Sequence, residues 1–350
     1  MGAKSIRYLG IVAVSSALFA SAVGPARAET VRVPSSSGGT LTLYSAQGYD
    51  STMAKAFQKS TGNQVKLTDD ATGNLLAKIA AERNNPQWDV VWFDGDAAMQ
   101  GLDVQGQLLR WAPANAKNYN ALGRSLIPSD HGFYPTAVTA AGALVYNTKK
   151  LTPAQAPKDW NDLLKPQFKN QVAAIDPAYS GPAFSLIAGM MQRKGGIAQG
   201  QAFFTALKGN GMKVFQTSDS VMNAVQTGAR LVGFAQDSGY YGAKSTGAPL
   251  GIVYPTSGVT LLPGVIAINA KSKHLAAAEA FVNYVLSQAG QNVMIHDPND
   301  PDANVVPVIT GISALKGRQV TGIKWQRLDY KWAASNENAI KLWYHNSIVQ

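Results

Sequence analysis

Short apolar runs alternate with segments of helical periodicity along the first third of the chain. Three of the runs have the length of strands, at residues 40–44, 64–67 and 89–93. Each interval between them places apolar residues on one face of a helix, as Leu75 and Ile79 do. The order strand, helix, strand, helix, strand is typical of a doubly wound α/β sheet. We therefore predict the α/β fold class for this region.

The same alternation returns in the middle of the chain and predicts a second α/β region. The expected strands are 143–146, 173–175, 213–215, 231–235 and 265–268, and the expected helices are 183–192, 198–207, 221–226 and 276–286. The stretch from Lys324 onward is rich in aromatic residues, and we expect it to form a terminal helix packed across the first region. An aromatic platform that binds carbohydrate is the alternative for this stretch.

The N-terminal residues have the three-part pattern of a secretory signal peptide. Lys4 and Arg7 precede an apolar run from Leu9 to Val23, and Ala26-Arg27-Ala28 gives a small-x-small cleavage pattern. A membrane anchor is the alternative, but a spanning helix needs about 20 apolar residues. We expect residues 1–28 to be removed and the mature protein to be exported.

Composition narrows the classes of function. Removing residues 1–28 takes away three of the 31 basic residues and leaves 28 against 21 acidic ones, a net charge of +7. Because the basic residues are scattered, we expect a solvated basic surface and no nucleic-acid partner. The chain has no cysteine, which excludes disulfides, thiol catalysis and cysteine-ligated metals. It also lacks the Gly-x-Ser-x-Gly, His-Glu-x-x-His, P-loop and Gly-x-Gly-x-x-Gly motifs, so we expect no enzyme, and an enzyme on the same fold is the remote alternative.

Six stretches carry a resemblance to a known family. They are Leu43-Tyr44-Ser45-Ala46-Gln47, Ala56-Phe57-Gln58-Lys59-Ser60-Thr61-Gly62, Asn85-Pro86-Gln87-Trp88-Asp89-Val90, Leu144-Val145-Tyr146-Asn147-Thr148, Lys158-Asp159-Trp160-Asn161-Asp162-Leu163-Leu164 and Ile252-Val253-Tyr254-Pro255-Thr256-Ser257-Gly258. Together they resemble the type 2 periplasmic solute-binding proteins of ABC importers, in the branch that contains ferric-ion, phosphonate and sugar-phosphate binders.

The resemblance implies two doubly wound lobes joined by two crossover strands, with a ligand cleft that closes by hinge motion. Lobe one would comprise residues 29–137 and 264–350, lobe two would comprise residues 138–263, and the crossings would fall near 134–140 and 261–265. It also implies a periplasmic monomer without a resident cofactor. Its partners would be a small-molecule ligand and the transmembrane subunits of the importer.

The turns that follow strands are the candidate ligand contacts, because ligands of open α/β sheets lie beyond the carboxyl ends of strands. Ser, Thr and Gly at helix starts supply O–H and N–H donors that suit an oxyanion, although ordinary N-capping uses the same residues. Asp94 and Asp96 are placed to accept from a ligand ammonium or sugar hydroxyl, or to cap the next helix. The predicted contacts are Ser45, Gln47, Thr72, Gly73, Asn74, Asp94, Tyr179, Ser180, Gly181, Ser218, Asp237 and Ser238.

Two ligand classes follow from the resemblance. Ser, Thr and Gly at helix starts, together with the Tyr254-Pro255 segment, favour a small anionic ligand such as a phosphonate or a phosphorylated metabolite. Ferric iron is the alternative, because Tyr240 and Tyr241 lie near the place where ferric binders carry tyrosine ligands. Gly48 occupies the expected histidine position, which weighs against iron.

Overall fold

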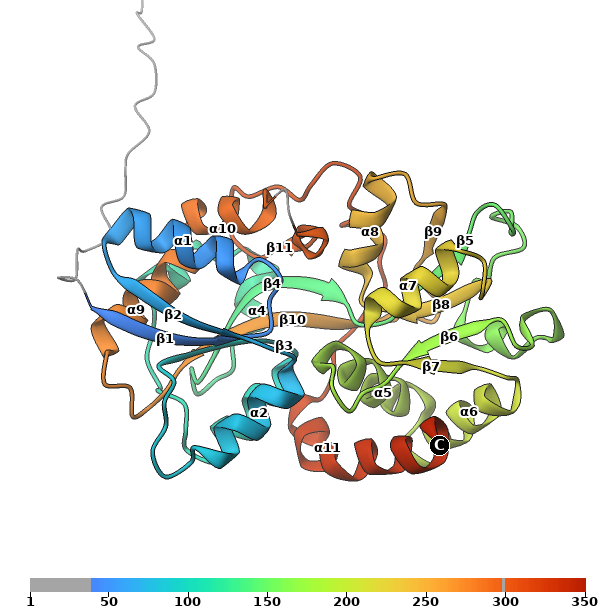
Figure 1. Cartoon of the computed structure of the whole chain (residues 1–350), viewed down its shortest axis with the longest axis horizontal. Coiled ribbons are helices and arrows are strands. Elements are labelled where there is room, and N and C mark those ends of the chain that lie inside the picture. The colour runs from blue at the N-terminus through green and yellow to red at the C-terminus, as the bar shows by residue number, and fades with distance from the viewer. Residues whose placement is uncertain (1–38, 298–299) are drawn as a thin grey trace, which may run out of the picture. The chain divides into compact units, whose positions relative to one another are not determined.

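Two β-sheets organise the part of the chain that the computed structural model describes, residues 39–297 and 300–350 (Figure 1). The predicted signal peptide, residues 1–28, lies outside these residues. Within the described part, no helix combines the length and apolar character needed to cross a bilayer. The prediction of an α/β fold with two doubly wound lobes is confirmed by the two sheets and their strand orders.

The first sheet has the strand order β11-β4-β10-β3-β1-β2, with β12 beside β10. Its strands are β1 (Thr40–Ser45), β2 (Gln64–Asp69), β3 (Val90–Asp94), β4 (Tyr134–Ala140), β10 (Val259–Ile268), β11 (Val306–Pro307) and β12 (Trp325–Gln326). β1 runs parallel to β2 and β3, whereas β10 runs antiparallel to β3 and β4. The carboxyl ends of β1 and β3 therefore lie at the same edge of the sheet.

Helices cover both faces of this sheet, as the side chains of β3, which alternate between the two faces, show. Val90 and Trp92 pack with α1 (Asp50–Thr61), α9 (Leu275–Val285) and α10 (Gln288–Ile295). Val91 and Phe93 point to the opposite face and pack with α2 (Thr72–Ala81) and α3 (Asp96–Asp103). A strand with two buried faces is continuously apolar, which is why the sequence pattern identified it.

The second sheet has the strand order β7-β6-β8-β5-β9. Its elements are β5 (Ala143–Asn147), β6 (Val172–Ile175), β7 (Lys213–Phe215), β8 (Val232–Ala235), β9 (Leu250–Val253), α5 (Gly181–Lys194), α6 (Ile197–Gly209), α7 (Ser218–Gln226) and α8 (Asp237–Ser245). One face packs on α5 and α6 and the other on α7 and Tyr240 of α8. Parallel pairing of β6 with β7 and β8 places three strand ends at one edge.

Two neighbouring strands of the first sheet carry the chain between the lobes. β4 ends three residues before β5 begins, and β10 follows β9 on the way back. β4 and β10 pair antiparallel, with an irregularity between Gly264 and Val265. The lobe boundaries expected at residues 137/138 and 263/264 fall inside these two strands.

The C-terminal helix α11 (Tyr330–Tyr344, red in Figure 1) contacts both lobes, through α3 and α5. Tyr330 lies edge-on to Phe133 of the first lobe, and Tyr344 lies edge-on to Phe204 of α6. We predicted that this helix packs on the first lobe. The structure shows that contact and a second contact with lobe two. The remaining short helical segments are α4 (Ala121–Ser125), η1 (Ala114–Asn118), η2 (Trp160–Leu164), η3 (Pro166–Phe168), η4 (Pro301–Ala303) and η5 (His345–Val349).

Candidate functional site

A cavity of about 610 Å³ lies between the two lobes, at the edges where the parallel strands end. Both lobes contribute to its wall. The predicted contacts that line it are Thr72, Asn74, Asp94, Tyr179, Ser180, Gly181 and Ser218. They converge because the turns after parallel strands of one sheet share an edge, and the two lobes face each other across these edges.

Three helices begin at this cavity, namely α2, α5 and α7. The leading N–H groups of a helix have no partner inside the helix, and they create positive potential at its start. At α5 the Ser180 Oγ accepts from the Ala183 N–H at 3.2 Å, and at α7 the Thr217 Oγ1 accepts from the Ser220 N–H at 3.1 Å. Ordinary N-capping is therefore realised at both starts. It uses the Ser180 oxygen as an acceptor and leaves its O–H proton to donate to a ligand.

Glycines bring the two lobes into contact at the cavity edge. The Gly73 N–H donates to the Tyr179 carbonyl oxygen at 3.3 Å, and a Cβ at Gly73 would lie only 2.8 Å from the Ala178 carbonyl oxygen. A Cβ at Gly181 would lie 2.5 Å from the Asp94 carbonyl oxygen. Gly73 does not line the cavity. The structure places it in the contact between the lobes.

Two carboxylates, Asp94 and Asp302, line both the main cavity and a neighbouring pocket of about 20 Å³. Burial is the main cause that raises the pKa of Asp94 to about 7, and the charges of Asp302 and Asp300 add to it. Burial likewise raises the pKa of Asp302. Gln47 lines the small pocket and is nearly fully buried, and its Oε1 accepts from the Tyr49 hydroxyl at 2.5 Å.

Besides Gly73 and Gln47, three more predicted contacts lie outside the wall of the main cavity, because their side chains serve the fold. Ser45 is fully buried, and its Oγ accepts from the Gln47 N–H at 3.2 Å. Asp237 is fully buried at the start of α8. Ser238 is also fully buried, but its Oγ donates to Asp302 Oδ1 at 2.8 Å. Ser238 therefore orients a carboxylate of the cavity without facing it.

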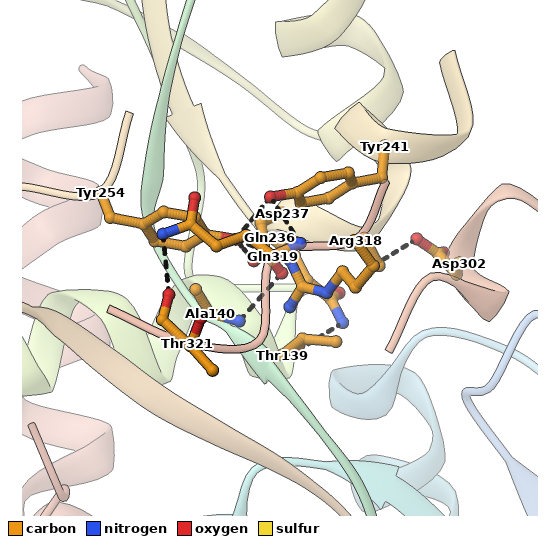
Figure 2. Close-up of polar contacts among 11 residues, drawn as sticks. Thr139, Ala140, Gln236, Asp237, Tyr241, Tyr254, Asp302, Arg318, Gln319 and Thr321 are labelled. Carbon is orange, nitrogen blue, oxygen red and sulfur yellow. Dashed lines mark hydrogen bonds and ion pairs between the residues drawn. The ribbon is translucent and has the colours of Figure 1, made fainter. Parts of the chain in front are cut away.

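Asp237 anchors a buried polar cluster beside the crossover strands (Figure 2). Its Oδ1 accepts from the Ala140 N–H at 2.9 Å. Its Oδ2 accepts from the Tyr254 hydroxyl at 2.6 Å and from Arg318 Nη1 at 2.5 Å. The Arg318 guanidinium also lies 4.6 Å from the centre of the Tyr241 ring. These contacts join lobe two to the C-terminal segment between β11 and β12 of the first sheet.

The tyrosine pair considered for iron does not line the cavity. Tyr240 is almost completely buried in the core of lobe two, and burial raises the pKa of its hydroxyl well above the usual value. Tyr241 packs on Arg318, and its Oη lies 3.2 Å from the Tyr254 Oη. Within residues 39–297 and 300–350, no three His, Asp or Glu side chains gather closely enough to hold a metal ion.

Sequence reasoning missed Gln216, Gln236 and Asp302, which also line the cavity. Gln216 and Gln236 come directly after β7 and β8, so the rule that identified Asp94 after β3 would have found them. Asp302 lies in a segment without strand or helix periodicity, and no pattern in the sequence indicates its position.

Comparisons with known proteins agree with this architecture. A family model for bacterial extracellular solute-binding proteins matches residues 52–320. The probable ABC transporter periplasmic-binding protein y4fP of Sinorhizobium fredii is 26% identical over 292 residues, covering 80% of this chain and 76% of the relative. The Fe(3+)-binding periplasmic protein of Serratia marcescens is 28% identical over 272 residues, covering 73% and 75%. The periplasmic binding protein AfuA of Actinobacillus pleuropneumoniae, solved with fructose-6-phosphate, has a TM-score of 0.79 at 22% identity, covering 89% of this chain and 98% of that one.

Proposed function

Since the chain belongs to the family of bacterial extracellular solute-binding proteins, we propose that it captures a small phosphonate or phosphate ester for an ABC importer. The family consists of solute-binding proteins, and we propose that this member delivers its ligand to transmembrane subunits and is not an enzyme. We further propose that residues 1–28 direct the protein to the periplasm and that it works there as a monomer. Closure of the two lobes over the cavity would hold the ligand.

The observation that carries this proposal is the meeting of three helix starts at one cavity. The starts of α2, α5 and α7 supply N–H donors and positive potential, which is the environment that a phosphate or phosphonate group requires. Ser180 and Ser218 add hydroxyl groups to the same wall. AfuA, which has a similar fold, binds fructose-6-phosphate, a ligand of the proposed class. This similarity supports the proposal.

Ferric iron fits these residues less well, although the Serratia relative is named for it. Tyrosine binds Fe(III) as phenolate, so its hydroxyl has to lose a proton. Burial raises the pKa of Tyr240, and Tyr241 is held against Arg318 outside the cavity. Neither side chain is placed to coordinate an ion in the cavity, and we therefore prefer the organophosphorus ligand.

Thermal unfolding with a ligand panel tests the proposal, because a bound ligand stabilises the fold in proportion to its excess over Kd. The panel contains alkyl and aminoalkyl phosphonates, sugar phosphates, glycerol phosphates and Fe(III). We expect at least one organophosphorus compound to raise the unfolding midpoint, and Fe(III) to leave it unchanged. An iron-dependent visible absorption band that disappears in Tyr241→Phe, without stabilisation by any organophosphorus compound, would overturn the proposal.

A pair of capping serines separates ligand contact from helix stability. Ser180 caps α5 at the cavity, and Ser287 caps α10 by the same kind of bond, to the Gly290 N–H at 3.0 Å, away from the cavity. Replacing either serine with alanine should cost about 1 kcal/mol of stability. Only Ser180→Ala should also weaken binding of the phosphonate or phosphate, by about 10-fold. Equal affinities of the two variants would remove Ser180 from the site.

A further inference from the structure

The two lobes differ strongly in charge. Residues 138–263, the expected extent of lobe two, contain 11 lysines and arginines, five aspartates and no glutamate, which gives a net charge of +6. Residues 39–137 and 264–350, which form lobe one, contain 16 basic and 15 acidic side chains and have a net charge of +1. Because charge of one sign attracts partners of the other sign, lobe two is the part of the molecule that favours an acidic partner.

The five aspartates of lobe two leave part of its surface without negative charge. Three of them come shortly after β6, β7 and β8, at the edge of the second sheet that faces the ligand cavity, namely Asp176, Asp219 and Asp237. The Asp159 carboxylate accepts from the Ser257 N–H at 2.9 Å and from its hydroxyl at 2.6 Å. Asp162 pairs with Lys165 Nζ at 2.7 Å. The aspartates are therefore occupied by these partners or lie at the cavity edge.

Five cations gather at the edge of the second sheet opposite the cavity. β5 runs antiparallel to β8 and β6 runs parallel to it, so the end of β5 lies near the starts of β6 and β8. The Asn147 N–H donates to the Leu231 carbonyl oxygen at 3.0 Å, and the Leu231 N–H donates to that of Gln171 at 3.1 Å. The Asn170 N–H donates to the Asn210 carbonyl oxygen at 2.8 Å, which adds the segment before β7. The cations beside these bonds, which we call the basic edge, are Lys149, Lys150, Lys169, Lys213 and Arg230.

The basic edge has no anionic partner within the described part of the chain. None of its five members takes part in an ion pair there. Its four lysines are exposed, whereas Arg230 is half-buried. Arg230 Nε is buried and has no acceptor at hydrogen-bond distance among the described residues. A buried N–H without an acceptor costs free energy, and an acceptor supplied by a partner would recover it.

A pocket of about 310 Å³ opens at the basic edge, between β7 and α7. Its described lining includes Lys213 and Arg230, the Phe215 ring and the polar side chains of Asn223 and Thr227, and it includes no acidic residue. Lys213 Nζ lies 5.2 Å from the centre of the Phe215 ring. A guanidinium binds a carboxylate through two parallel N–H donors, and an aromatic ring packs on the methylene groups beside it. The pocket is thus suited to a glutamate or aspartate side chain.

β7 adds a backbone edge to this pocket. It is the outermost strand of the second sheet, and no described strand pairs with its outer side. Lys213 and Phe215 face α7, whereas Val214 packs in the core on the opposite face of the sheet. An open strand edge can pair with an extended chain through backbone groups. The positive charges beside this edge repel a second copy of the same edge, so they select an acidic chain of another protein.

We propose that the basic edge is a docking surface for an extended acidic segment of a partner protein. One carboxylate of the segment enters the pocket at Lys213 and Arg230, and the backbone of the segment runs along β7. Lys150 lies close to the pocket, since a Cβ at Gly228 would be 3.4 Å from its Cε, and it attracts a further acidic side chain. No member of the basic edge lines the ligand cavity, so the proposal does not depend on which ligand the cavity takes.

Three fluorescein-labelled heptapeptides test the surface by fluorescence anisotropy with the mature protein. Thr-Val-Glu-Val-Glu-Val-Thr places two carboxylates on one face of a strand, because side chains alternate between its faces. Thr-Val-Gln-Val-Gln-Val-Thr removes the charge and should bind at least about 10-fold more weakly. Thr-Val-Glu-Pro-Glu-Val-Thr keeps the charge but removes the central N–H, and it should bind about 5-fold more weakly.

Variants locate the site on the protein. Lys213→Gln/Arg230→Gln should weaken binding of the acidic peptide at least about 30-fold, because both charge-assisted contacts are lost. Lys149→Gln/Lys150→Gln should weaken it only about 3-fold, since these cations lie at the rim and remain solvated. The matched control is Lys271→Gln/Lys273→Gln, which makes the same change of charge at exposed positions of lobe one and should leave the affinity unchanged. Calorimetric unfolding midpoints show whether each variant is folded.

The outcomes decide between this surface and its alternatives. The proposal is overturned if the acidic peptide shows no saturable binding, if the glutamine peptide binds equally well, or if the lobe-one control loses the same affinity. Equal binding of the proline peptide would refute the pairing along β7. Vesicles of equal parts phosphatidylcholine and phosphatidylglycerol form a further arm. If the protein binds them through Lys213 and Arg230 but does not bind the peptide, the surface recognises anionic lipid, which also overturns the proposal.

Discussion

Replacing Arg318 with methionine is the perturbation that most directly probes how the C-terminal segment is held to lobe two. The guanidinium and the Asp237 carboxylate are both fully buried, with Nη1 2.5 Å from Oδ2. Arg318→Met keeps much of the apolar volume and removes the charge. Asp237 would then be a buried carboxylate with no cation beside it, and it would keep only the Ala140 N–H and the Tyr254 hydroxyl as donors.

The size of the effect follows from these contacts. Removing one partner of a buried ion pair costs about 3–5 kcal/mol. The two remaining donors at Asp237 place the expected loss at the lower end, about 3 kcal/mol. Arg318 Nε and Nη2 have no hydrogen-bond partner among the described residues, so their removal recovers part of the cost of burying the guanidinium. For a protein of this size, the loss corresponds to a fall of roughly 5 °C in the unfolding midpoint.

Differential scanning calorimetry measures the midpoint, and Arg327→Met is the matched control. Arg327 is exposed and bonds to the Ser125 carbonyl oxygen at 2.6 Å, so its replacement should cost less than about 1 kcal/mol. The double variant Arg318→Met/Asp237→Asn should lose less free energy of unfolding than the two single variants lose together, by at least about 1.5 kcal/mol. The reasoning is refuted if Arg318→Met lowers the midpoint no more than Arg327→Met does.

Two further predictions concern the cavity. The pKa of Asp94 is raised from 3.8 to about 7, so ionising it in the fold costs free energy, and the stability of the unliganded protein should fall as pH rises from about 4 to about 7. Asp94→Asn should remove that loss and be about 2 kcal/mol more stable at pH 8 but not at pH 4, and parallel midpoint curves for the two proteins would contradict this. Gly181→Ala should weaken ligand binding at least about 10-fold, because its Cβ would lie 2.5 Å from the Asp94 carbonyl oxygen and separate the lobes. Gly101→Ala in α3, where no atom lies within 4 Å of the new Cβ, should leave calorimetric affinity unchanged.

The sequence was sufficient to predict the sheets and much of the cavity. The two-faced burial of β3 produces a continuous apolar run, and the rule that ligands lie beyond strand ends brought Thr72, Ser180 and Ser218 to one wall. That rule depends only on strand direction and chain order, and both can be read from the pattern of elements.

The remaining features depend on which way a side chain turns and on contacts between distant segments. Ser45 and Asp94 each end a strand of the first sheet, yet Ser45 is buried and Asp94 reaches the cavity. Asp302 lies in the three-residue helical segment η4 and Arg318 in a loop, and the paths of both are set by tertiary packing rather than by local periodicity. The contact of α11 with both lobes is likewise invisible in its own sequence, because an apolar face does not specify its partners.

The double attachment of α11 has a consequence for rates. The helix holds α3 and α5 together at a distance from the crossover strands β4 and β10, so the lobes cannot separate by bending those strands alone. Opening also requires α11 to slide over one of its two neighbours, and packed side chains such as Tyr344 against Phe204 must change partners when it does. We therefore expect this repacking step to limit the exchange of ligand. At high ligand concentration the observed association rate levels off at the rate of opening, whatever the affinity of the closed cavity.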